Sequence, residues 1–274
     1  QEQGVLELKG PFFSSLDLTS AASGTAESEI FASLDTSVGG IVVNTGESSP
    51  QFIELAEGVK KVASQALERY DVRDPAAIVP LLIEGHNAAS EAGLSAVSPG
   101  SKAFMEQKQL EFRAALRSAA GIQIDVLSDG ETVVPGTTFS VSARVFHPSE
   151  PSIKVNSVDI KTPPRWTVKP ADQTSQTQGQ QFRRETANFG ANFNVTVGAD
   201  ASPTQPYWLE QPRRGDLFSW SGGSEQTLPF QAPVAFAEIK MTVAGKEITF
   251  RQPVEYRYAD DIRGELRRPL VVVP

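Results

Sequence analysis

Apolar residues recur at three- and four-residue steps from about residue 49 to residue 121, a spacing that predicts amphipathic helices. The first helix is expected to begin at Ser49-Pro50, since a capping residue followed by proline is a common helix start. A second is expected to open at Asp74-Pro75, where the same pattern occurs, and Pro80 either kinks it or marks its true start. The expected apolar stripes are Phe52, Leu55, Val59, Val62, Ala66 and Tyr70 in the first helix and Ile78, Leu81, Leu82 and Ala89 in the second.

A third helix is expected from about Ser101 to Ala120, with Gly121 as its stop. Its apolar face consists of Met105, Phe112, Leu116 and Ala119. Because the connections between the three expected helices are short, they favour an antiparallel helical arrangement.

From Ile122 onward the apolar positions follow a period of 2, which predicts β-strands. The clearest alternating stretches are 139–145, 187–197, 235–243 and 254–258, and 270–273 is a candidate final strand. In 153–160 the apolar residues change from odd to even positions near Asn156-Ser157, which predicts a β-bulge. Ala244-Gly245-Lys246 has the composition of a hairpin turn. Seven or more short strands with turns between them indicate an antiparallel β-sandwich of immunoglobulin or fibronectin type III kind.

The predicted fold class is therefore α+β with several domains. Residues 1–48 are expected to form an irregular N-terminal arm with a short strand at Val5, Leu6 and Leu8, residues 49–121 a helical domain, and residues 122–274 the β-sandwich. The Ser/Thr/Ala/Gly-rich segment 14–28 is interpreted as a linker or a wrapped arm, and the Gln-rich segment 173–181 as a mobile loop.

Composition narrows the classes of function. A net charge of −8 and a pI near 5.0 argue against a nucleic-acid-binding protein. The absence of cysteine excludes disulfides and thiolate zinc sites. No apolar run approaches the roughly 18–20 residues needed for a membrane span. The chain starts at Gln1 without an initiator methionine or a leader, which suggests a processed or excised piece.

The residue types that most often act in catalysis, histidine and paired acids, do not occur in a catalytic or metal-binding sequence pattern. The two histidines, His86 and His147, have no partner at metal-ligand spacing, and we interpret His86 as a helix-face residue and His147-Pro148 as part of a turn. Asp260-Asp261 follows a strand and is interpreted as a pair of turn acids, because a glycosidase needs two carboxyl groups that face each other. Asn194 begins a glycosylation sequon that lies within a predicted strand. No catalytic residue, metal ligand or cofactor is predicted.

The stretch 206–220 offers the most chemistry, since it holds two of the three tryptophans and an Arg-Arg pair. Its aromatic rings can stack on sugar faces while its charged groups hydrogen-bond to hydroxyls. The candidate ligand-binding residues are Tyr207, Trp208, Arg213, Arg214, Asp216 and Trp220. The structural alternative, which we favour from the residues alone, is an aromatic plug in which Trp208 and Phe218 pack under the sandwich and the arginines pair with nearby acids.

Several segments resemble the region downstream of the catalytic domain in large bacterial members of the PIG-L (LmbE-like) de-N-acetylase family. They are IFASLDTSVGGI (30–41), DPAAIVPLLIEG (74–85), VLSDGETVVPGTTFSVSARV (126–145), PTQPYWL (203–209) and VEYRYADDIRGELRRPLVVVP (254–274). The family's chemistry is zinc-dependent removal of an acetyl group from an N-acetylated sugar. Its His-Pro-Asp-Asp signature is absent, and His147-Pro148 matches only the first two letters, so no zinc ligand or catalytic base carries over.

The resemblance implies a non-catalytic accessory region of a sugar de-N-acetylase. Its partners would be the catalytic domain of the same polypeptide, which would hold the zinc, and carbohydrate contacted through 206–220, with no nucleic acid and no membrane span. Export to the periplasm or the cell exterior is expected from the family and the sandwich architecture. The alternatives are a structural spacer or protein-interaction module without a ligand, and an independent hydrolase with an unrecognised acidic site.

Overall fold

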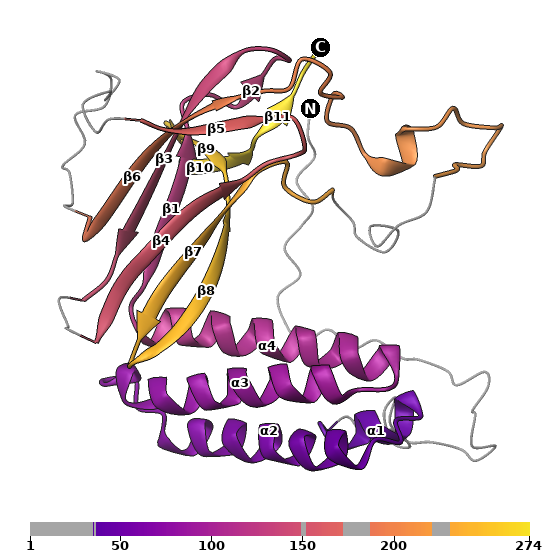
Figure 1. Cartoon of the computed structure of the whole chain (residues 1–274), viewed down its shortest axis with the longest axis vertical. Coiled ribbons are helices and arrows are strands. Elements are labelled where there is room, and N and C mark those ends of the chain that lie inside the picture. The colour runs from indigo at the N-terminus through magenta and orange to yellow at the C-terminus, as the bar shows by residue number, and fades with distance from the viewer. Residues whose placement is uncertain (1–34, 36, 149–151, 172–186, 221–230) are drawn as a thin grey trace, which may run out of the picture. The chain divides into compact units, whose positions relative to one another are not determined.

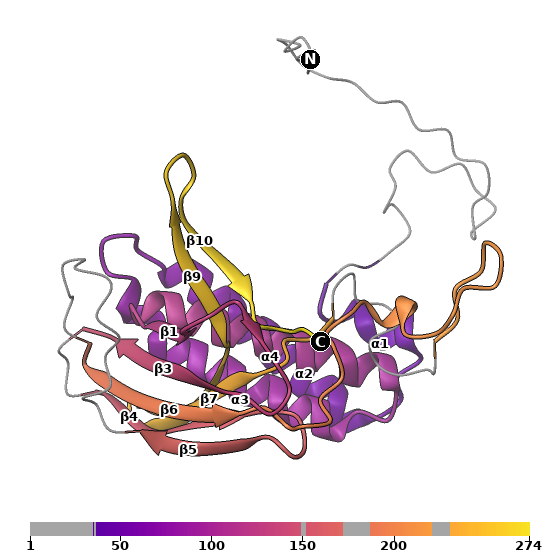
Figure 2. The same cartoon turned by 90° about the horizontal axis from the view of Figure 1, so that it is seen from above.

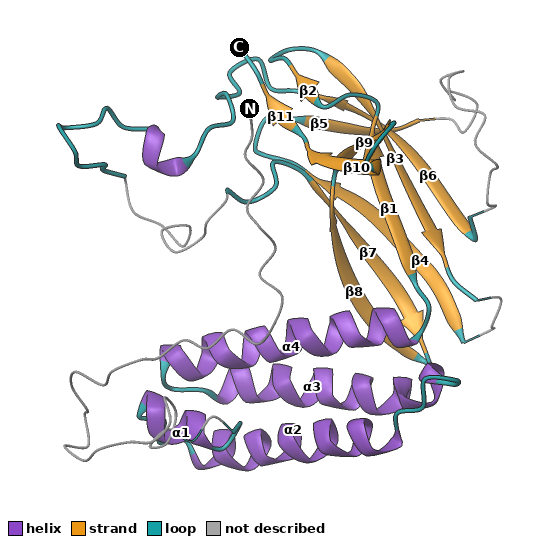
Figure 3. Cartoon of the chain, turned by 180° about the vertical axis from the view of Figure 1, so that it is seen from behind, coloured by secondary structure: helices purple, strands orange, loops and turns teal. Residues whose placement is uncertain are grey.

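The computed structural model describes residues 35, 37–148, 152–171, 187–220 and 231–274 (Figure 1). Helices come first along the chain and strands follow (Figure 3). The protein therefore has the mixed helix and sheet content that the change of hydrophobic period predicts, and an α+β fold fits it. The predicted strand at Val5–Leu8 and the segments 14–28 and 173–181 lie outside the described residues.

The three predicted helices are present. The helical elements are α1 (Gly40–Thr45), α2 (Pro50–Arg69), the 3-10 turn η1 (Pro75–Ile78), α3 (Val79–Ser95) and α4 (Pro99–Ala119). The sequence does not predict α1, which lies in the stretch expected to be an irregular arm. Pro80 marks the true start of α3, because it occupies the first turn, where its missing N–H is not needed.

The helix ends follow local chemistry. The Ser49 hydroxyl accepts the Phe52 N–H at 3.2 Å and so caps α2, as predicted. Tyr70 does not join the buried stripe: α2 ends at Arg69, and the Tyr70 side chain is 52% exposed. Gly121 stops α4 with a φ of +63°, and the Ile122 N–H donates to the Arg117 carbonyl at 3.0 Å. This is the Schellman arrangement, in which a left-handed glycine ends the helix.

The chain divides into two compact units. Of the described residues, those up to 60 and those from 88 to 106 form the first unit, and those from 61 to 87 and from 107 onward form the second. The core of the first unit is formed by Phe52, Ala56, Val59, Ala89, Ala92 and Met105. These units divide the three long helices, so the expected domain boundaries at residues 48 and 121 stay predictions.

In the first unit, the Glu47 carboxylate joins the segments that precede α2 and α4. Its Oε1 accepts the N–H groups of Ser48 and Ser49, both at 2.9 Å, and its Oε2 accepts those of Val97 at 3.1 Å and Ser98 at 3.0 Å. The residue is only 6% exposed. The bond from the Ser49 N–H, helped by those from Ser98 and Ser48, lowers the pKa of Glu47 to about 2. One carboxylate thus satisfies donors ahead of two helices.

Replacing Glu47 by glutamine is expected to lower the stability of the protein at neutral pH, because the amide offers one acceptor oxygen where the carboxylate offers two. Since the pKa of Glu47 is depressed on folding, its contribution is complete above about pH 4.5 and is lost as the pH falls toward about 2. Thermal unfolding of wild type and Glu47→Gln across this range measures the effect. Glu54→Gln, an exposed change on α2, is the control. A difference between wild type and Glu47→Gln that is independent of pH would contradict this account.

Every strand of the described residues lies in the second unit. The six-stranded sheet has the order β10-β9-β1-β3-β6-β5, the three-stranded sheet β4-β7-β8, and the two-stranded sheet β11-β2. Their bounds are β1 Gln123–Ser128, β2 Thr132–Val133, β3 Thr138–Phe146, β4 Ile153–Lys161, β5 Thr167–Ala171, β6 Phe189–Thr196, β7 Phe236–Val243, β8 Lys246–Pro253, β9 Glu255–Asp260, β10 Gly264–Pro269 and β11 Val271–Val272.

Two local predictions for the strands are confirmed. The register of β4 against β7 shifts between Val155 and Ser157, which is the expected bulge. Ala244 and Gly245 both have positive φ, 46° and 77°, between β7 and β8. A two-residue turn of this kind matches the twist of the strands that it joins.

The expectation of a purely antiparallel sandwich is wrong at two pairings. β1 pairs with β9 in parallel at Leu127 and Glu255, and β11 pairs with β2 in parallel. Both pairings join strands far apart in sequence, where no hairpin dictates an antiparallel direction. The sequence also does not predict β10, whose residues are almost all exposed. Figure 2 shows β9 and β10 as a two-stranded ribbon that extends past the other strands.

Each of the two larger sheets has at least one strand whose alternate residues are buried. Alternate residues of β3 and β7 are buried: Phe139, Val141, Ala143 and Val145 in β3, and Ala237, Ile239, Met241 and Val243 in β7. Trp166 packs edge-to-face on Phe139, with ring centroids 6.2 Å apart, and is also buried. One of the three tryptophans is therefore part of the core, and the other two belong to the loop between β6 and β7.

Candidate functional site

The loop between β6 and β7 leaves the sheet at Val197 and is attached to β11. The Val197 N–H donates to the Thr137 carbonyl at 2.9 Å. The Thr204 N–H donates to the Val272 carbonyl at 2.9 Å, and the Val272 N–H donates to the Thr204 Oγ1 at 3.0 Å. These reciprocal bonds fix the loop just before the predicted aromatic stretch.

Three aromatic rings of this loop form a cluster. The 3-10 turn η2 (Tyr207–Leu209) follows Pro206, and the Leu209 N–H donates to the Pro206 carbonyl at 2.8 Å. The Tyr207 ring centroid lies 4.9 Å from that of Trp208 and 5.8 Å from that of Trp220, both edge-to-face. This is a favoured geometry for aromatic pairs. The structure thus brings together the aromatic members of the candidate set from both ends of the stretch.

The charged members of the set lie on a tight turn between these two ends. Arg214 and Leu217 exchange two backbone hydrogen bonds of 3.0 Å, and Gly215 supplies the positive φ of 58° that the turn requires. Arg213, Arg214 and Asp216 are all exposed. None of these three side chains forms an ion pair with another described residue.

The exposure of the loop decides against the buried plug. Phe218 and Trp220 are each 43% exposed, and Leu217 is 74% exposed. Tyr207 and Trp208 are half-buried. The plug alternative requires Phe218 and Trp208 to pack beneath a sheet, and neither side chain is buried. The arrangement instead offers partly exposed rings next to cationic and anionic groups, which suits a ligand with an apolar face and polar edges.

The two histidines belong to different elements of the fold. His86 is a half-buried residue of α3, and its Nδ1 lies 3.3 Å from the Asn87 Oδ1. His147 follows β3, with its Nδ1 2.7 Å from the Pro148 carbonyl. Across the described residues, no group of three or more His, Cys, Asp or Glu side chains is placed to hold a metal ion.

Asp260 is the last residue of β9 and Asp261 begins the turn to β10, which fits their interpretation as acids at a turn. The Asp260 Oδ1 accepts the Arg263 N–H at 2.8 Å and the Ile262 N–H at 3.0 Å. These two bonds lower the pKa of Asp260. Asn194 lies within β6, opposite Ser140 and Lys169, as the alternating pattern predicts.

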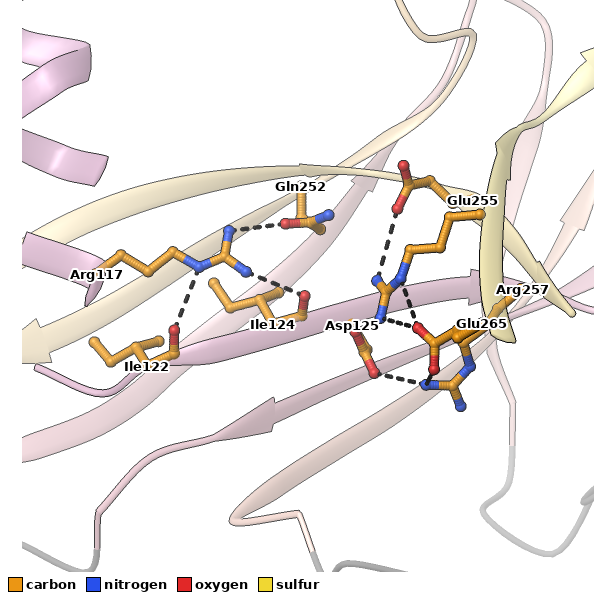
Figure 4. A network of polar contacts seen from close by, with 9 residues as sticks. Arg117, Ile122, Ile124, Asp125, Gln252, Glu255, Arg257 and Glu265 are labelled. Carbon is orange, nitrogen blue, oxygen red and sulfur yellow. Dashed lines mark hydrogen bonds and ion pairs between the residues drawn. The ribbon is translucent and has the colours of Figure 1, made fainter. Parts of the chain in front are cut away.

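A network of ion pairs that the sequence does not predict lies on one face of β1, β9 and β10 (Figure 4). The Asp125 carboxylate binds Arg267 at 2.8 Å and Arg257 at 3.2 Å. Glu265 pairs with both arginines, and Glu255 lies 3.7 Å from Arg267. Burial lowers the pKa of Arg267, but the hydrogen bonds and negative charges of Asp125 and Glu265 together outweigh burial and raise it. Each of the two arginines and three acids has an oppositely charged partner within the network, so we interpret it as structural.

Arg117 connects the end of α4 to two strands and is also absent from the sequence prediction (Figure 4). Its Nη1 donates to the Gln252 Oε1 at 2.9 Å, its Nη2 to the Ile124 carbonyl at 3.3 Å and its Nε to the Ile122 carbonyl at 3.4 Å. All three acceptors are neutral. No local pattern signals this role, because Gln252 lies 135 positions further along the chain.

No known protein-family profile matches the sequence, and no curated protein shows significant sequence similarity to it. None of the described helices is both long and apolar enough to cross a membrane.

Proposed function

We propose that this chain is the non-catalytic accessory region of a sugar de-N-acetylase. It supports the catalytic domain of the same polypeptide, which holds the zinc, and contacts carbohydrate through residues 206–220. The observation that carries the proposal is the partly exposed cluster of Tyr207, Trp208 and Trp220. As part of the same proposal, the two larger sheets form an immunoglobulin- or fibronectin-like sandwich, and the protein is exported.

The physical argument rests on the shape and polarity of a sugar ring. A pyranose presents an apolar face of C–H groups and a polar rim of hydroxyls, so it matches an aromatic surface flanked by hydrogen-bonding side chains. Trp220 supplies a partly exposed indole. Arg213, Arg214 and Asp216, exposed on the adjacent turn, supply donors and acceptors for hydroxyl and acetamido groups.

The resemblance supports the same site. Two of the resembling segments are 203–209 and 254–274. They contain Thr204 and Val272, whose hydrogen bonds attach the loop to β11. The resemblance thus covers both the residues that present Tyr207 and Trp208 and the strand that anchors them.

The second candidate function is a protein-interaction module without a sugar ligand. It is favoured by the exposed apolar residues Leu209, Leu217 and Phe218 beside the aromatic cluster. Apolar side chains gathered on an exposed loop also suit a protein partner.

Tryptophan fluorescence, titrated with oligomers of N-acetylglucosamine, separates these functions. We expect a saturable change in emission from Trp208 and Trp220. Trp220→Ala is expected to weaken binding about tenfold, the effect typical of removing a central aromatic contact. Trp166→Phe is the matched control, since it removes the buried tryptophan and leaves the loop intact.

Two results would contradict the proposal in different ways. A flat titration, with Trp208 and Trp220 shielded from acrylamide quenching, would remove the carbohydrate contact and favour the structural spacer. Deacetylase activity of this chain by itself would contradict its assignment as non-catalytic.

A further inference from the structure

The loop between β6 and β7 presents the tripeptide Arg214-Gly215-Asp216 on a two-residue turn. The Arg214 N–H donates to the Leu217 carbonyl and the Leu217 N–H donates to the Arg214 carbonyl, both at 3.0 Å, so Gly215 and Asp216 occupy the two central positions. The φ of Gly215 is +58°, whereas the φ of Asp216 is not positive. This is the pattern of a type II′ turn, which takes glycine at the first central position. The backbone of the tripeptide is therefore held by hydrogen bonds within the turn itself.

The charged side chains of the tripeptide are exposed and unpaired. Each of the residues 211–220 is exposed. Neither the Arg214 guanidinium nor the Asp216 carboxylate forms an ion pair with another described residue, although the two carry opposite charges. The arginines of β9 and β10 behave differently, since Arg257 and Arg267 both pair with Asp125. The turn thus keeps one positive and one negative group for a partner outside the described residues.

A partner that binds both groups needs two different chemical features. The Asp216 carboxylate is the kind of hard oxygen ligand that divalent cations take, and Mg²⁺ is commonly bound through only one or two carboxylates with waters at its other positions. A protein that holds such a cation at its surface can therefore accept a carboxylate from a second protein. The Arg214 guanidinium matches an acidic side chain, with which it forms paired hydrogen bonds. Leu217, which is 74% exposed, adds an apolar contact beside them.

We propose that Arg214-Gly215-Asp216 binds a metal-dependent cell-adhesion receptor, a protein whose ligand site combines a divalent cation with acidic side chains. Asp216 completes the coordination of the receptor's cation, and Arg214 pairs with a receptor acid. Gly215 has no side chain, so nothing between the two charged groups obstructs the receptor. This contact is additional to the carbohydrate contact, and it rests on the proposed function in one respect, which is that an exported chain can meet such a receptor.

Attachment of cultured fibroblasts to a surface coated with the intact chain tests this contact. We expect cells to attach in Mn²⁺, EDTA to release them, and the free peptide Gly-Arg-Gly-Asp-Ser to compete with the coated protein. Asp216→Glu is expected to weaken attachment about tenfold or more, because it keeps the charge but moves the carboxylate away from the cation by one methylene group. Asp261→Glu, a change at the exposed turn between β9 and β10, is the matched control and should attach cells like the wild type. Equal melting temperatures show that the three proteins fold alike.

Absence of attachment to the wild type, attachment that EDTA does not affect, or full attachment to Asp216→Glu would overturn the proposal. Attachment that N-acetylglucosamine oligomers block, and that Trp220→Ala loses but Asp216→Glu retains, would instead assign the contact to carbohydrate on the cell surface. The fluorescence titration with these oligomers uses neither cells nor a metal ion. A failure of cell attachment therefore leaves the carbohydrate contact standing, and a flat sugar titration leaves the receptor contact standing.

Discussion

Replacing Gly85 by alanine is expected to destabilise the protein by about 1–3 kcal/mol, the usual cost of inserting a methyl group into a packed interior. This destabilisation is opposite to the usual effect of replacing glycine by alanine. In a helix interior, alanine is normally about 0.5–1 kcal/mol more favourable than glycine. The new methyl group would lie 2.2–2.7 Å from three atoms of the Phe112 ring. That ring is buried and rigid, so it cannot move aside as the end of a flexible side chain would.

Gly58→Ala is the matched control for this change. Gly58 also lies inside a long helix, α2, but a Cβ there meets nothing within 4 Å. We expect Gly58→Ala to stabilise the protein by about 0.5–1 kcal/mol. Chemical denaturation of the two variants therefore yields changes in unfolding free energy of opposite sign.

A double variant tests the cause. Phe112→Leu removes ring atoms that block the methyl group, so Gly85→Ala should cost less in the Phe112→Leu background than in the wild type. Equal costs in both backgrounds would show that the penalty does not come from the ring. Stabilisation by Gly85→Ala would contradict the close approach of α3 and α4 at Gly85 and Phe112.

The elements that the sequence predicts correctly are those whose signal is local. The stripe Phe52, Val59, Val62 and Ala66 repeats at helical spacing and is buried in α2. Capping by Ser49 and the stop at Gly121 depend on residues within one turn. The same holds for the alternation in β3 and β7 and for the turn at Ala244-Gly245, because neighbouring residues alone decide them.

The sequence does not predict the elements whose partners lie far away along the chain. β10 pairs with β9 over six positions, but its segment GELRRP has no apolar period, since both of its faces are polar or half-exposed. The Glu47 carboxylate takes two of its four donors from Val97 and Ser98, 50 and 51 positions away. The parallel pairing of β9 with β1 likewise joins residues that no turn connects.

The candidate loop was predicted in part from its own residues, and in part it depends on contacts that are distant in sequence. Residue type alone identifies Tyr207, Trp208 and Trp220 as the most interesting aromatic residues, and the structure places their rings in contact. Their exposure could not be predicted, because it depends on the hydrogen bonds between Thr204 and Val272 and on the turn at Gly215. The preference for a buried plug therefore fails in part for a reason outside the stretch, since Thr204 and Val272 do not belong to it.

Replacing Arg117 by methionine is expected to destabilise the protein by about 2 kcal/mol, because it leaves three acceptors without their shared donor. These are the Ile122 and Ile124 carbonyls and the Gln252 Oε1. Methionine keeps most of the length and apolar contact of the arginine stem, so the loss reports on the hydrogen bonds. The cap at Gly121 is retained, because there Arg117 contributes only its backbone carbonyl.

The salt dependence of this loss identifies its origin. All three acceptors of Arg117 are neutral, so the penalty of Arg117→Met should persist in high salt. The effect of removing Asp125 from its partly exposed ion pairs with Arg257 and Arg267 should instead shrink. Denaturation by urea at low and high salt measures both. Arg69→Met, an exposed change at the end of α2, is the control and should alter stability by less than about 0.5 kcal/mol. A penalty for Arg117→Met that disappears in salt would mean that Arg117 acts through the charge of Asp125, and the end of α4 would then be held to the sheet by electrostatic attraction.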